Sequence, residues 1–334
     1  MKNFSAPQFL VMLLLLGVSA LTSQAQTIRR VNNNGITGTN IYATLQLAHD
    51  AASTGDIIQV EPSTTAYAGV AITRQVSFVG PGYFLAENAP PTLQASPITA
   101  VVGQMDFQGG SAGASMSGLV CNSSCLMRTN NISITRCQIA SYIYLGYTTV
   151  TTGAVIRQNY CAGVQQSSVS TNSLIANNII YNGDVNLSSV GNTGEFSNNT
   201  VVASNVSLNQ FTARNNYFNN ALTTTANTSW SYNLFTTTTP PTLGTNSNNT
   251  ANVPLASVFV LSPGAQFDGF YKLRTGTNPA TGGGQGGIDI GATGSATNYG
   301  YRFAGLPAIP AIYQLNQSVT GNNLNVTLGT RSNN

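Results

Sequence analysis

The chain has 334 residues, of which only 6% are charged, and its formal net charge is +3. Globular domains usually have about 25% charged residues, so amide and hydroxyl side chains must form most of the polar surface here. Without a basic patch, nucleic acid is excluded as an expected partner. An apolar content of 42% with little charge also excludes the composition of a disordered chain.

Residues 1–25 are predicted to be a secretory signal peptide. Lys2 is followed by an apolar run from Phe9 to Leu21, and Ser23-Gln24-Ala25 places small residues where cleavage requires them. The run is too short for a membrane span, which needs about 20 apolar residues, and no second long run follows. We therefore expect a periplasmic or extracellular protein with no membrane span.

A capping helix is predicted over residues 41–53, with Asn40 as its N-cap. Apolar residues recur there at helical spacing, at Ile41, Leu45, Ala48 and Ala52. A strand follows over residues 56–60. The only histidine of the chain, His49, lies on this helix, and we assign it no catalytic role.

This opening resembles that of secreted right-handed parallel β-helix proteins of the pectin-lyase-like superfamily. The matching residues are Leu45, Ala48, Ala51, Ala52, Gly55, Asp56, Ile58, Val60 and Tyr67. Near the C-terminus, the segment 286–292 resembles the Asp-x-Gly-Ala signature of many bacterial β-helix proteins, and we interpret Asp289 as a structural turn residue. The resemblance implies a helix that covers one end of the solenoid, and it does not specify an activity.

Four cysteines follow the first coils. In an exported protein, Cys121 and Cys125 are candidates for a small disulfide loop. A Cys-x3-Cys pair without a nearby histidine is poor support for zinc, and we predict no metal and no cofactor. Cys137 and Cys161 lie out of register in neighbouring repeats, so we expect both to be buried thiols.

The strongest pattern is a repeat of six ungapped segments. They are 134–139, 156–161, 175–180, 196–201, 213–218 and 230–235. Their sixth position is always apolar and their first usually is. Their fourth position is Cys137, then Asn159, Asn178, Asn199, Asn216 and Asn233. A repeat of about 20 residues is typical of a solenoid.

The spacing within each segment indicates a bend. Positions one and six are five residues apart, so in a straight strand they would face opposite sides. Both can face one core only if the chain turns between them, and we place the asparagine in that turn. Stacked coils would then align the amides in a hydrogen-bonded ladder. The prediction is an all-β, right-handed parallel β-helix over residues 26–300, with three strands per coil.

After residue 235 the repeat weakens. We expect one or two closing coils between Phe259 and Tyr271 and an extended C-terminal tail over residues 301–334. The tail contains prolines at alternate spacing and then an alternating segment, 322–328. Alternate prolines are typical of an extended strand laid along the body.

Catalytic carboxylates are scarce. The chain has nine acidic residues, whereas glycoside hydrolysis needs two carboxyls about 5–10 Å apart. Within the repeats, Asp184 and Glu195 are predicted on different sides of the coil. Arg157 and Arg214 share the second position, which points outward, about 14 Å apart. This suits contacts with an extended polymer better than one catalytic centre. Solvated surface arginines are the alternative.

Tyr160 and Tyr217 share position five, which is also predicted to point outward. Such aromatic rows can stack on sugar rings, but they are also ordinary residues of β-sheet surfaces, which is the interpretation we favour. The sequence therefore favours a secreted, non-catalytic module for carbohydrate or surface binding or for an extracellular structural role, with a polysaccharide or cell-surface glycan as the candidate partner and Arg157, Arg214, Tyr160 and Tyr217 as the candidate ligand-binding residues. The alternatives are a polysaccharide lyase or glycoside hydrolase that uses Arg157, Asp184 or Glu195, and a self-assembling scaffold. The sequence does not specify the oligomeric state.

Overall fold

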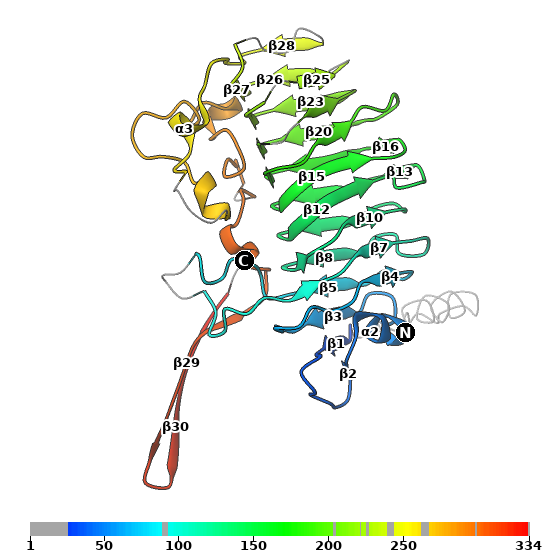
Figure 1. Cartoon of the computed structure of the whole chain (residues 1–334), viewed down its shortest axis with the longest axis vertical. Helices are drawn as coiled ribbons and strands as arrows, with labels where there is room; N and C mark the ends of the chain where they lie inside the picture. The colour runs from blue at the N-terminus through cyan, green and yellow to red at the C-terminus, as the bar shows by residue number, and fades with distance from the viewer. Residues whose placement is uncertain are drawn as a thin grey trace, which may run out of the picture.

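The structure, a computed structural model, describes residues 26–88, 93–202, 205–220, 222–224, 227–238, 244–261, 267–297 and 299–332. The segment predicted as a signal peptide, residues 1–25, lies outside the described residues. The described chain winds into a parallel β-solenoid of about nine turns (Figure 1). The predicted all-β repeat fold is confirmed, and each regular coil contributes strands to three rows.

The first row is one parallel sheet that ends at the bend of each coil. In spatial order its strands are β2 (Ile41–Tyr42), β1 (Ile28–Val31), β3 (Ile57–Val60), β5 (Ser77–Val79), β8 (Ser115–Ser117), β11 (Ser133–Thr135), β14 (Val155–Arg157), β17 (Ser173–Ala176), β20 (Gly194–Ser197), β23 (Phe211–Arg214), β26 (Ser229–Ser231) and β28 (Thr245–Ser247). Neighbouring strands keep the repeat in register, with Ile134 opposite Ile156 and Ile175 opposite Phe196.

A second sheet carries the other two rows, which β12 (Gln138–Leu145) and β15 (Tyr160–Gln166) join. The second row, directly after the bend, also contains β6 (Val101–Val102), β9 (Val120–Cys121), β18 (Ile179–Ile180), β21 (Thr200–Val201), β24 (Tyr217–Phe218) and β27 (Leu234–Phe235). The third row contains β4 (Val70–Ile72), β7 (Met105–Phe107), β10 (Cys125–Met127), β19 (Val185–Leu187), β22 (Val206–Leu208) and β25 (Leu222–Thr224). A small pair, β13 (Thr151–Thr152) and β16 (Ser170–Thr171), lies beside them.

The bend depends on position three of each repeat. The residues there all have positive φ angles between 52° and 60°, and they are Arg136, Gln158, Asn177, Asn198, Asn215 and Tyr232. The turn therefore lies one residue earlier than the sequence prediction placed it. Asparagine tolerates this left-handed conformation better than most residues. Because one residue turns the chain sharply, positions one and six both point into the core, where all of them are buried.

Position four places its asparagine side chains in single file inside the coil. The Asn178 Oδ1 atom accepts hydrogen bonds from the Asn159 main-chain N–H and Nδ2, at 2.9 and 3.0 Å. The Asn178 Nδ2 atom donates to Ile156 O and to Asn199 Oδ1. The same pattern continues through Asn216 and Asn233 and ends at Asn249. Every buried amide of the row is thus satisfied, as buried polar groups must be.

The N-terminal helix is shorter than predicted. Helix α2 (Leu45–Ala51) begins after Thr44, whose hydroxyl oxygen accepts a hydrogen bond from Leu47 N at 3.2 Å. The predicted N-cap, Asn40, instead has a φ of 58° and leads into β2, which pairs with β1. The helix packs against β1 to β4 at the N-terminal end of the solenoid (Figure 1).

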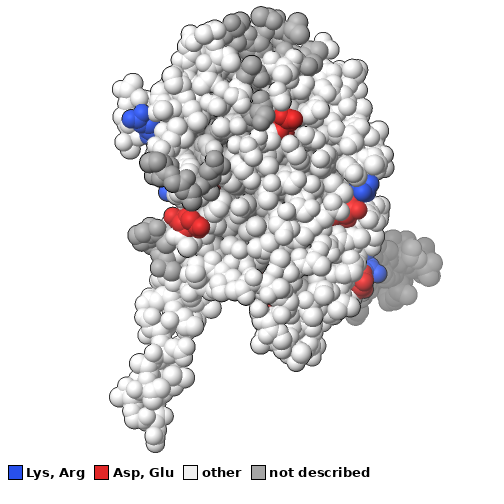
Figure 2. Space-filling view, in the orientation of Figure 1, with Lys and Arg blue, Asp and Glu red and all other residues white. Residues whose placement is uncertain are grey.

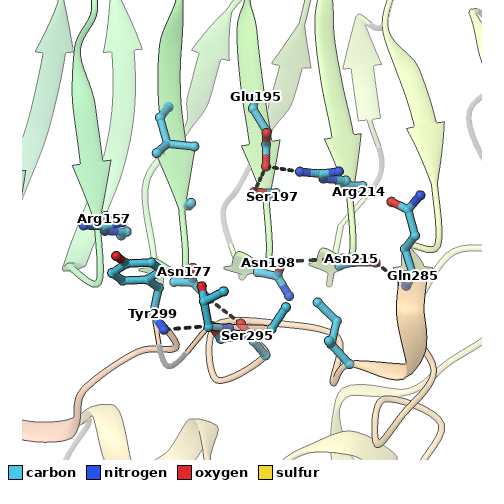
Figure 3. Close-up of a pocket in the computed structure, with 16 residues that line it drawn as sticks. Arg157, Asn177, Glu195, Ser197, Asn198, Arg214, Asn215, Gln285, Ser295 and Tyr299 are labelled. Carbon is cyan, nitrogen blue, oxygen red and sulfur yellow. Dashed lines mark hydrogen bonds and ion pairs between the residues drawn. The ribbon is translucent and has the colours of Figure 1, made fainter.

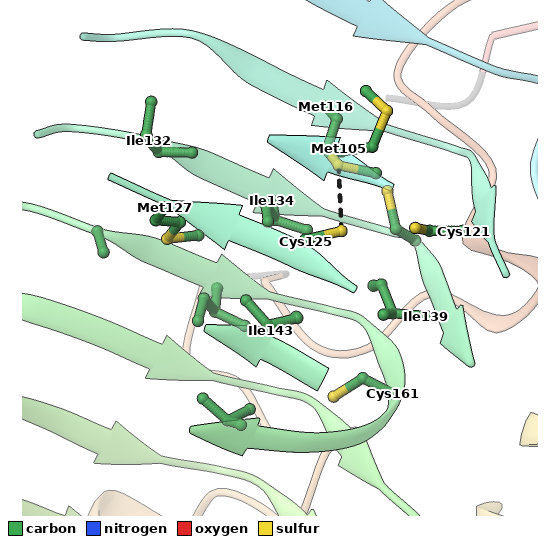
Figure 4. Close-up of a cluster of buried hydrophobic side chains, with 14 of the residues drawn as sticks. Met105, Met116, Cys121, Cys125, Met127, Ile132, Ile134, Ile139, Ile143 and Cys161 are labelled. Atoms are coloured by element: carbon green, nitrogen blue, oxygen red, sulfur yellow. Dashed lines mark hydrogen bonds between the residues drawn. The ribbon is translucent and has the colours of Figure 1, made fainter. Parts of the chain in front are cut away.

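The four cysteines are free, buried thiols. The predicted bridge between Cys121 and Cys125 is therefore absent from this structure. The two residues lie on strands of different rows. The Cys121 thiol donates to Gly103 O at 3.1 Å, while the Cys125 thiol points to the sulfur of Met116, 3.9 Å away (Figure 4). Burial raises the pKa of Cys137 and of Cys161 from the ordinary value of 9.0 to about 12.

After the last coil the chain folds back along the outside of the solenoid as a C-terminal cover, residues 253–306 (Figure 1). It contains α3 (Leu255–Val258) and the 3₁₀ turns η1 (Asp268–Tyr271), η2 (Gln285–Gly287) and η3 (Phe303–Gly305). Phe259 forms an antiparallel bridge with Leu273, and the described residues between Phe259 and Tyr271 form no strand of the predicted closing coils.

The cover is held by a second apolar cluster and a buried polar centre. Its residues Val258, Phe259 and Ile290 pack over the outer side of the second row. The buried Asp268 carboxylate accepts from Asn88 Nδ2, the Tyr301 hydroxyl and a main-chain N–H, at 2.8–3.1 Å. Burial raises the pKa of Asp268. These bonds tie the cover to the loop that follows β5.

The chain ends in an antiparallel hairpin of β29 (Ala311–Thr320) and β30 (Asn323–Arg331). It projects away from the body, whereas the sequence suggested a strand laid along it (Figure 1). Gly321, with a φ of 60°, lies in the two-residue turn that joins the strands. At the base, Ala95 N donates to Ile312 O, and Arg331 donates to Leu93 O.

Candidate functional site

The candidate site is a groove of about 360 Å³ between the outer side of the first row and the edge of the C-terminal cover (Figure 3). Strands β14, β17, β20 and β23 form its floor, and cover residues such as Ser295, Thr297 and Tyr299 form one wall. Arg157 and Arg214, both selected from the sequence, line this one groove together.

Strand register sets the distance between the two arginines. Arg157 lies beside Ala176, Ala176 beside Ser197, and Ser197 beside Arg214. Three strand steps correspond to about 14 Å. Because the two residues between the arginines are small, the floor stays low and the guanidinium groups stand at either end. A short oligomer lying along the solenoid axis can therefore contact both.

One carboxylate lies in the groove. Glu195 Oε1 accepts from Arg214 Nη2 at 2.8 Å and from the Ser197 hydroxyl at 2.5 Å (Figure 3). The Glu195 and Arg214 side chains are 35% and 39% exposed, so water screens this pair and it contributes little to stability. An anionic ligand can compete with Glu195 for Arg214 without a large loss of folding free energy.

Arg157 lies at the other end of the groove. Its guanidinium carbon is 4.5 Å from the centre of the Tyr299 ring, a cation–π contact. Its Nε atom is buried, and among the described residues it has no hydrogen-bond partner. A buried donor without a partner costs free energy. A ligand oxygen placed here would satisfy this donor, and the 54% exposed Tyr299 ring offers an adjacent apolar face.

The wall of the groove is fixed by the position-three side chains of the bend. Asn177 Nδ2 donates to Ala292 O and Gly294 O of the cover, and Asn198 Nδ2 donates to Asp289 O. Gln158 also donates to Tyr299 O and Gly300 O, and Arg136 donates to Leu306 O, while Asn215 Oδ1 accepts from Gln285 N. Asp289 also accepts from Gly282 N at 2.9 Å, a contact that fits a structural turn residue.

Two of the predicted ligand-binding residues are not available to a ligand. Tyr160 and Tyr217 point away from the coil core, but the C-terminal cover buries both, with 2% and 0% exposure. The Tyr217 hydroxyl donates to Val253 O, and the Tyr160 ring stacks on Tyr181 at 4.4 Å. The repeat spacing predicted their direction relative to the coil, but it could not predict which segment would pack over them.

Other sequence candidates lie outside the groove. Asp184 is in the third row, where its Oδ1 accepts from Asn205, so it and Glu195 lie on different sides as predicted from their spacing. Tyr142, Tyr144 and Tyr147 are neighbours, but their rings are inclined by 54° and 69° and form no flat platform for a sugar. His49 is buried in α2 and is paired with Thr73 N.

Most residues of the groove were not identified as ligand-binding candidates from the sequence, and Tyr299 and Ser197 are two of them. Tyr299 comes from the cover, about 140 residues after Arg157 in the chain, and no periodicity connects the two. Ser197 occupies the same repeat position as the two arginines. That shared position was the available signal, because the outward row holds Arg157, Ala176, Ser197 and Arg214 in order.

In the part of the chain that the structure describes, no helix has the length and apolar character of a membrane span. Nor do three or more His, Cys, Asp or Glu side chains gather there as a metal site would require. No family model matches the chain, and neither a curated protein nor a solved structure matches it. The fold is thus established as a parallel β-solenoid, and the function must be argued from the groove.

Proposed function

We propose that this chain is an exported β-solenoid, built like the pectin-lyase-like proteins, that binds an extended acidic polysaccharide without cleaving it. The observation that carries the proposal is the alignment of Arg157 and Arg214 in one groove along the solenoid axis. Arginine pairs with carboxylate and sulfate oxygens through two parallel hydrogen bonds. Two such contacts about 14 Å apart select a repeating anionic chain over a single small anion.

The rest of the groove supports a sugar chain as the ligand. Asn177, Asn198 and Ser197 line it with amide and hydroxyl groups, which suit hydroxyl-rich ligands. Tyr299 gives one exposed aromatic face at the end where Arg157 lies. Glu195 neutralises one of the two positive charges, so binding requires the ligand anion to replace a partner that Arg214 already has.

The test is a depletion assay of the purified protein against a panel of insoluble or immobilised glycans, uronate-rich, sulfated and neutral. We expect retention on an acidic glycan that weakens as salt rises, because ions screen exposed charges. Arg157→Ala and Arg214→Ala should each weaken retention roughly 10- to 100-fold, the range for a charge-assisted hydrogen bond of about 1.5–3 kcal/mol. Arg274→Ala is the matched control, because Arg274 is an exposed arginine of the cover outside this groove.

Three results would contradict the proposal: no retention on any acidic glycan, equal retention on neutral ones, or equal weakening by Arg274→Ala. Circular dichroism of each variant establishes that the coil is intact.

A second candidate is a polysaccharide lyase or hydrolase that works in the same groove. The observation in its favour is the carboxylate of Glu195 beside Ser197 and Arg214. Against hydrolysis stands the need for a second carboxyl, because Asp184 lies in the third row. Release of reducing ends or unsaturated uronate from the same panel, lost in Glu195→Gln and retained in Asp184→Ala, would favour the enzyme over the binding module.

A further inference from the structure

The projecting hairpin of β29 and β30 is amphipathic. On one face, Leu315 pairs with Leu328 and Val319 pairs with Leu324 across the strands, with Val326 between them. The opposite face holds only polar side chains, in the pairs Asn316 with Thr327, Ser318 with Asn325, and Thr320 with Asn323. Directly paired residues point to the same side of a sheet, so one side is a strip of Leu and Val with one polar side chain, Gln317, opposite Val326.

Nothing in the described structure covers this strip. Leu315, Val319, Leu324, Val326 and Leu328 are 49–73% exposed. Isolated two-stranded hairpins are marginally stable in water, and natural proteins protect exposed strands with charges or prolines. Here, residues 311–330 contain neither Lys, Arg, Asp, Glu, His nor Pro. In the view of Figure 2 the projecting arm likewise carries no charged side chain. The strip is thus an unprotected apolar surface on the part of the chain that reaches furthest from the body.

We infer that the hairpin is a self-association element, whose Leu and Val strip packs face to face against the same strip of a second copy of this chain. Twofold symmetry places the same patch on both sides. A strip that is apolar on one side apart from Gln317, and uncharged on both sides, is complementary to itself. Two sheet faces packed in this way lie about 10 Å apart, with their side chains interdigitated.

Charge argues for a second copy over a lipid surface. Segments that lie on membranes usually combine an apolar face with Lys or Arg on the polar one, and the polar face here has only Asn, Thr, Ser and Gln. The cation at the base, Arg331, donates to Leu93 O and lies 5.9 Å from the Tyr313 ring. An uncharged strip suits an uncharged partner surface. A second copy of this chain offers one, because only 6% of its residues are charged.

The size of the strip predicts a weak dimer. Strands of ten and nine residues form a face about 34 Å long and about 10 Å wide. Two such faces bury roughly 700 Å² in total, whereas stable interfaces bury about 1,200–2,000 Å². The dissociation constant of the dimer should therefore lie in the micromolar to submillimolar range.

The test is sedimentation velocity of the chain without residues 1–25, from micromolar to submillimolar concentration. We expect the wild type to shift from monomer to dimer as concentration rises. The double variant Val319→Lys/Leu324→Lys should remain monomeric, because it places charge on the apolar strip. The matched control is Ser318→Lys/Asn325→Lys, which adds the same charge to the neighbouring cross-strand pair on the polar face and should dimerise like the wild type.

Cysteine substitution gives a second measurement that does not depend on lysine. Gln317 lies on the apolar face opposite Val326, and Asn316 lies on the polar face. Under mild oxidation, Gln317→Cys should form a disulfide-linked dimer readily and Asn316→Cys should not. The inference is overturned if the wild type stays monomeric throughout, if both lysine variants dimerise alike, or if both cysteine variants cross-link equally. It is also overturned if the wild type binds neutral lipid vesicles instead of itself.

Discussion

Asn177 and Asn178 are neighbours in the chain, but their side chains serve opposite sides of the coil wall. Asn178 points inward and bonds to the asparagines of the coils before and after it. Asn177 points outward and holds the C-terminal cover through two main-chain carbonyls. The same division recurs at Asn198 with Asn199 and at Asn215 with Asn216.

The difference arises from one backbone angle. The φ of Asn177 is 55°, in the left-handed region, and this turn directs two successive side chains to opposite sides of the wall. The inner row is therefore self-sufficient, because each asparagine amide hydrogen-bonds to the equivalent asparagine of the next coil. The outer row is open and depends on a segment 70 or more residues later in sequence. One dipeptide thus builds a core in one direction and fixes the wall of the groove in the other.

High pH should produce the largest effect, and it acts on both sides of the wall. Burial raises the pKa of Cys137, Cys161 and Tyr271 to about 12 in each case. A folded-state pKa above the unfolded value contributes stability at low pH that is lost as pH rises. Between about pH 9 and 12, each of the two thiols should lower the free energy of unfolding of the protein by about 4 kcal/mol, at about 1.4 kcal/mol per pH unit.

Urea unfolding midpoints measured across this range test the alkaline prediction. Replacing both Cys137 and Cys161 by alanine should flatten the dependence above pH 9. If the unfolding midpoint of the double variant falls with pH as steeply as that of the wild type, the pH dependence does not originate in the two buried thiols.

The inner row is tested by Asn178→Ala. This change removes four buried hydrogen bonds, two accepted from Asn159 and two donated to Ile156 O and Asn199. The groups left behind stay buried without partners, each at a cost of about 1–3 kcal/mol. We expect a loss of about 4 kcal/mol in the free energy of unfolding, seen as a lower urea midpoint for the whole molecule. A loss below that of Asn177→Ala would refute the ranking of the two rows.

The outer row is tested by Asn177→Ala and Asn177→Gly. Both lose the bonds to Ala292 O and Gly294 O, but only alanine also resists the left-handed conformation, at about 1–2 kcal/mol. We expect about 2–3 kcal/mol for alanine and roughly 1 kcal/mol less for glycine. Hydrogen exchange should rise in the cover while the coil strands stay protected. Equal exchange in both regions would show that the cover and coil unfold as one unit.

The repeat could be predicted from the sequence because its rules are local. Apolar residues at positions one and six, with asparagine at position four, determine which side chains enter the core, and six copies make the pattern clear. Asn249 was not recognised, because it lies in the polar stretch after Phe235 where the apolar positions are lost. The helix start was placed too early, after Asn40, because Ile41 fits the helical spacing of Leu45, Ala48 and Ala52. In the structure, Ile41 and Tyr42 instead form a strand that pairs with β1.

The groove was less predictable, because it depends on contacts between distant segments. Repeat spacing gave the outward direction of Arg157 and Arg214 and the distance between them. It could not indicate that residues 253–306 would bury Tyr160 and Tyr217 while leaving the arginine row open. The pairing of Glu195 with Arg214 also needed the strand register, because the two are 19 residues apart in sequence.

Stacks of repeats that touch only their neighbours can fray one unit at a time from either end. Here a segment that follows all the coils in sequence runs back across five successive coils, from Asn215 at one end to Arg136 at the other. It connects these five coils to one another along the solenoid axis. A coil in the middle cannot open without breaking its bonds to the cover, and the same segment of the cover is bonded to the coils on either side, so these five coils should melt together.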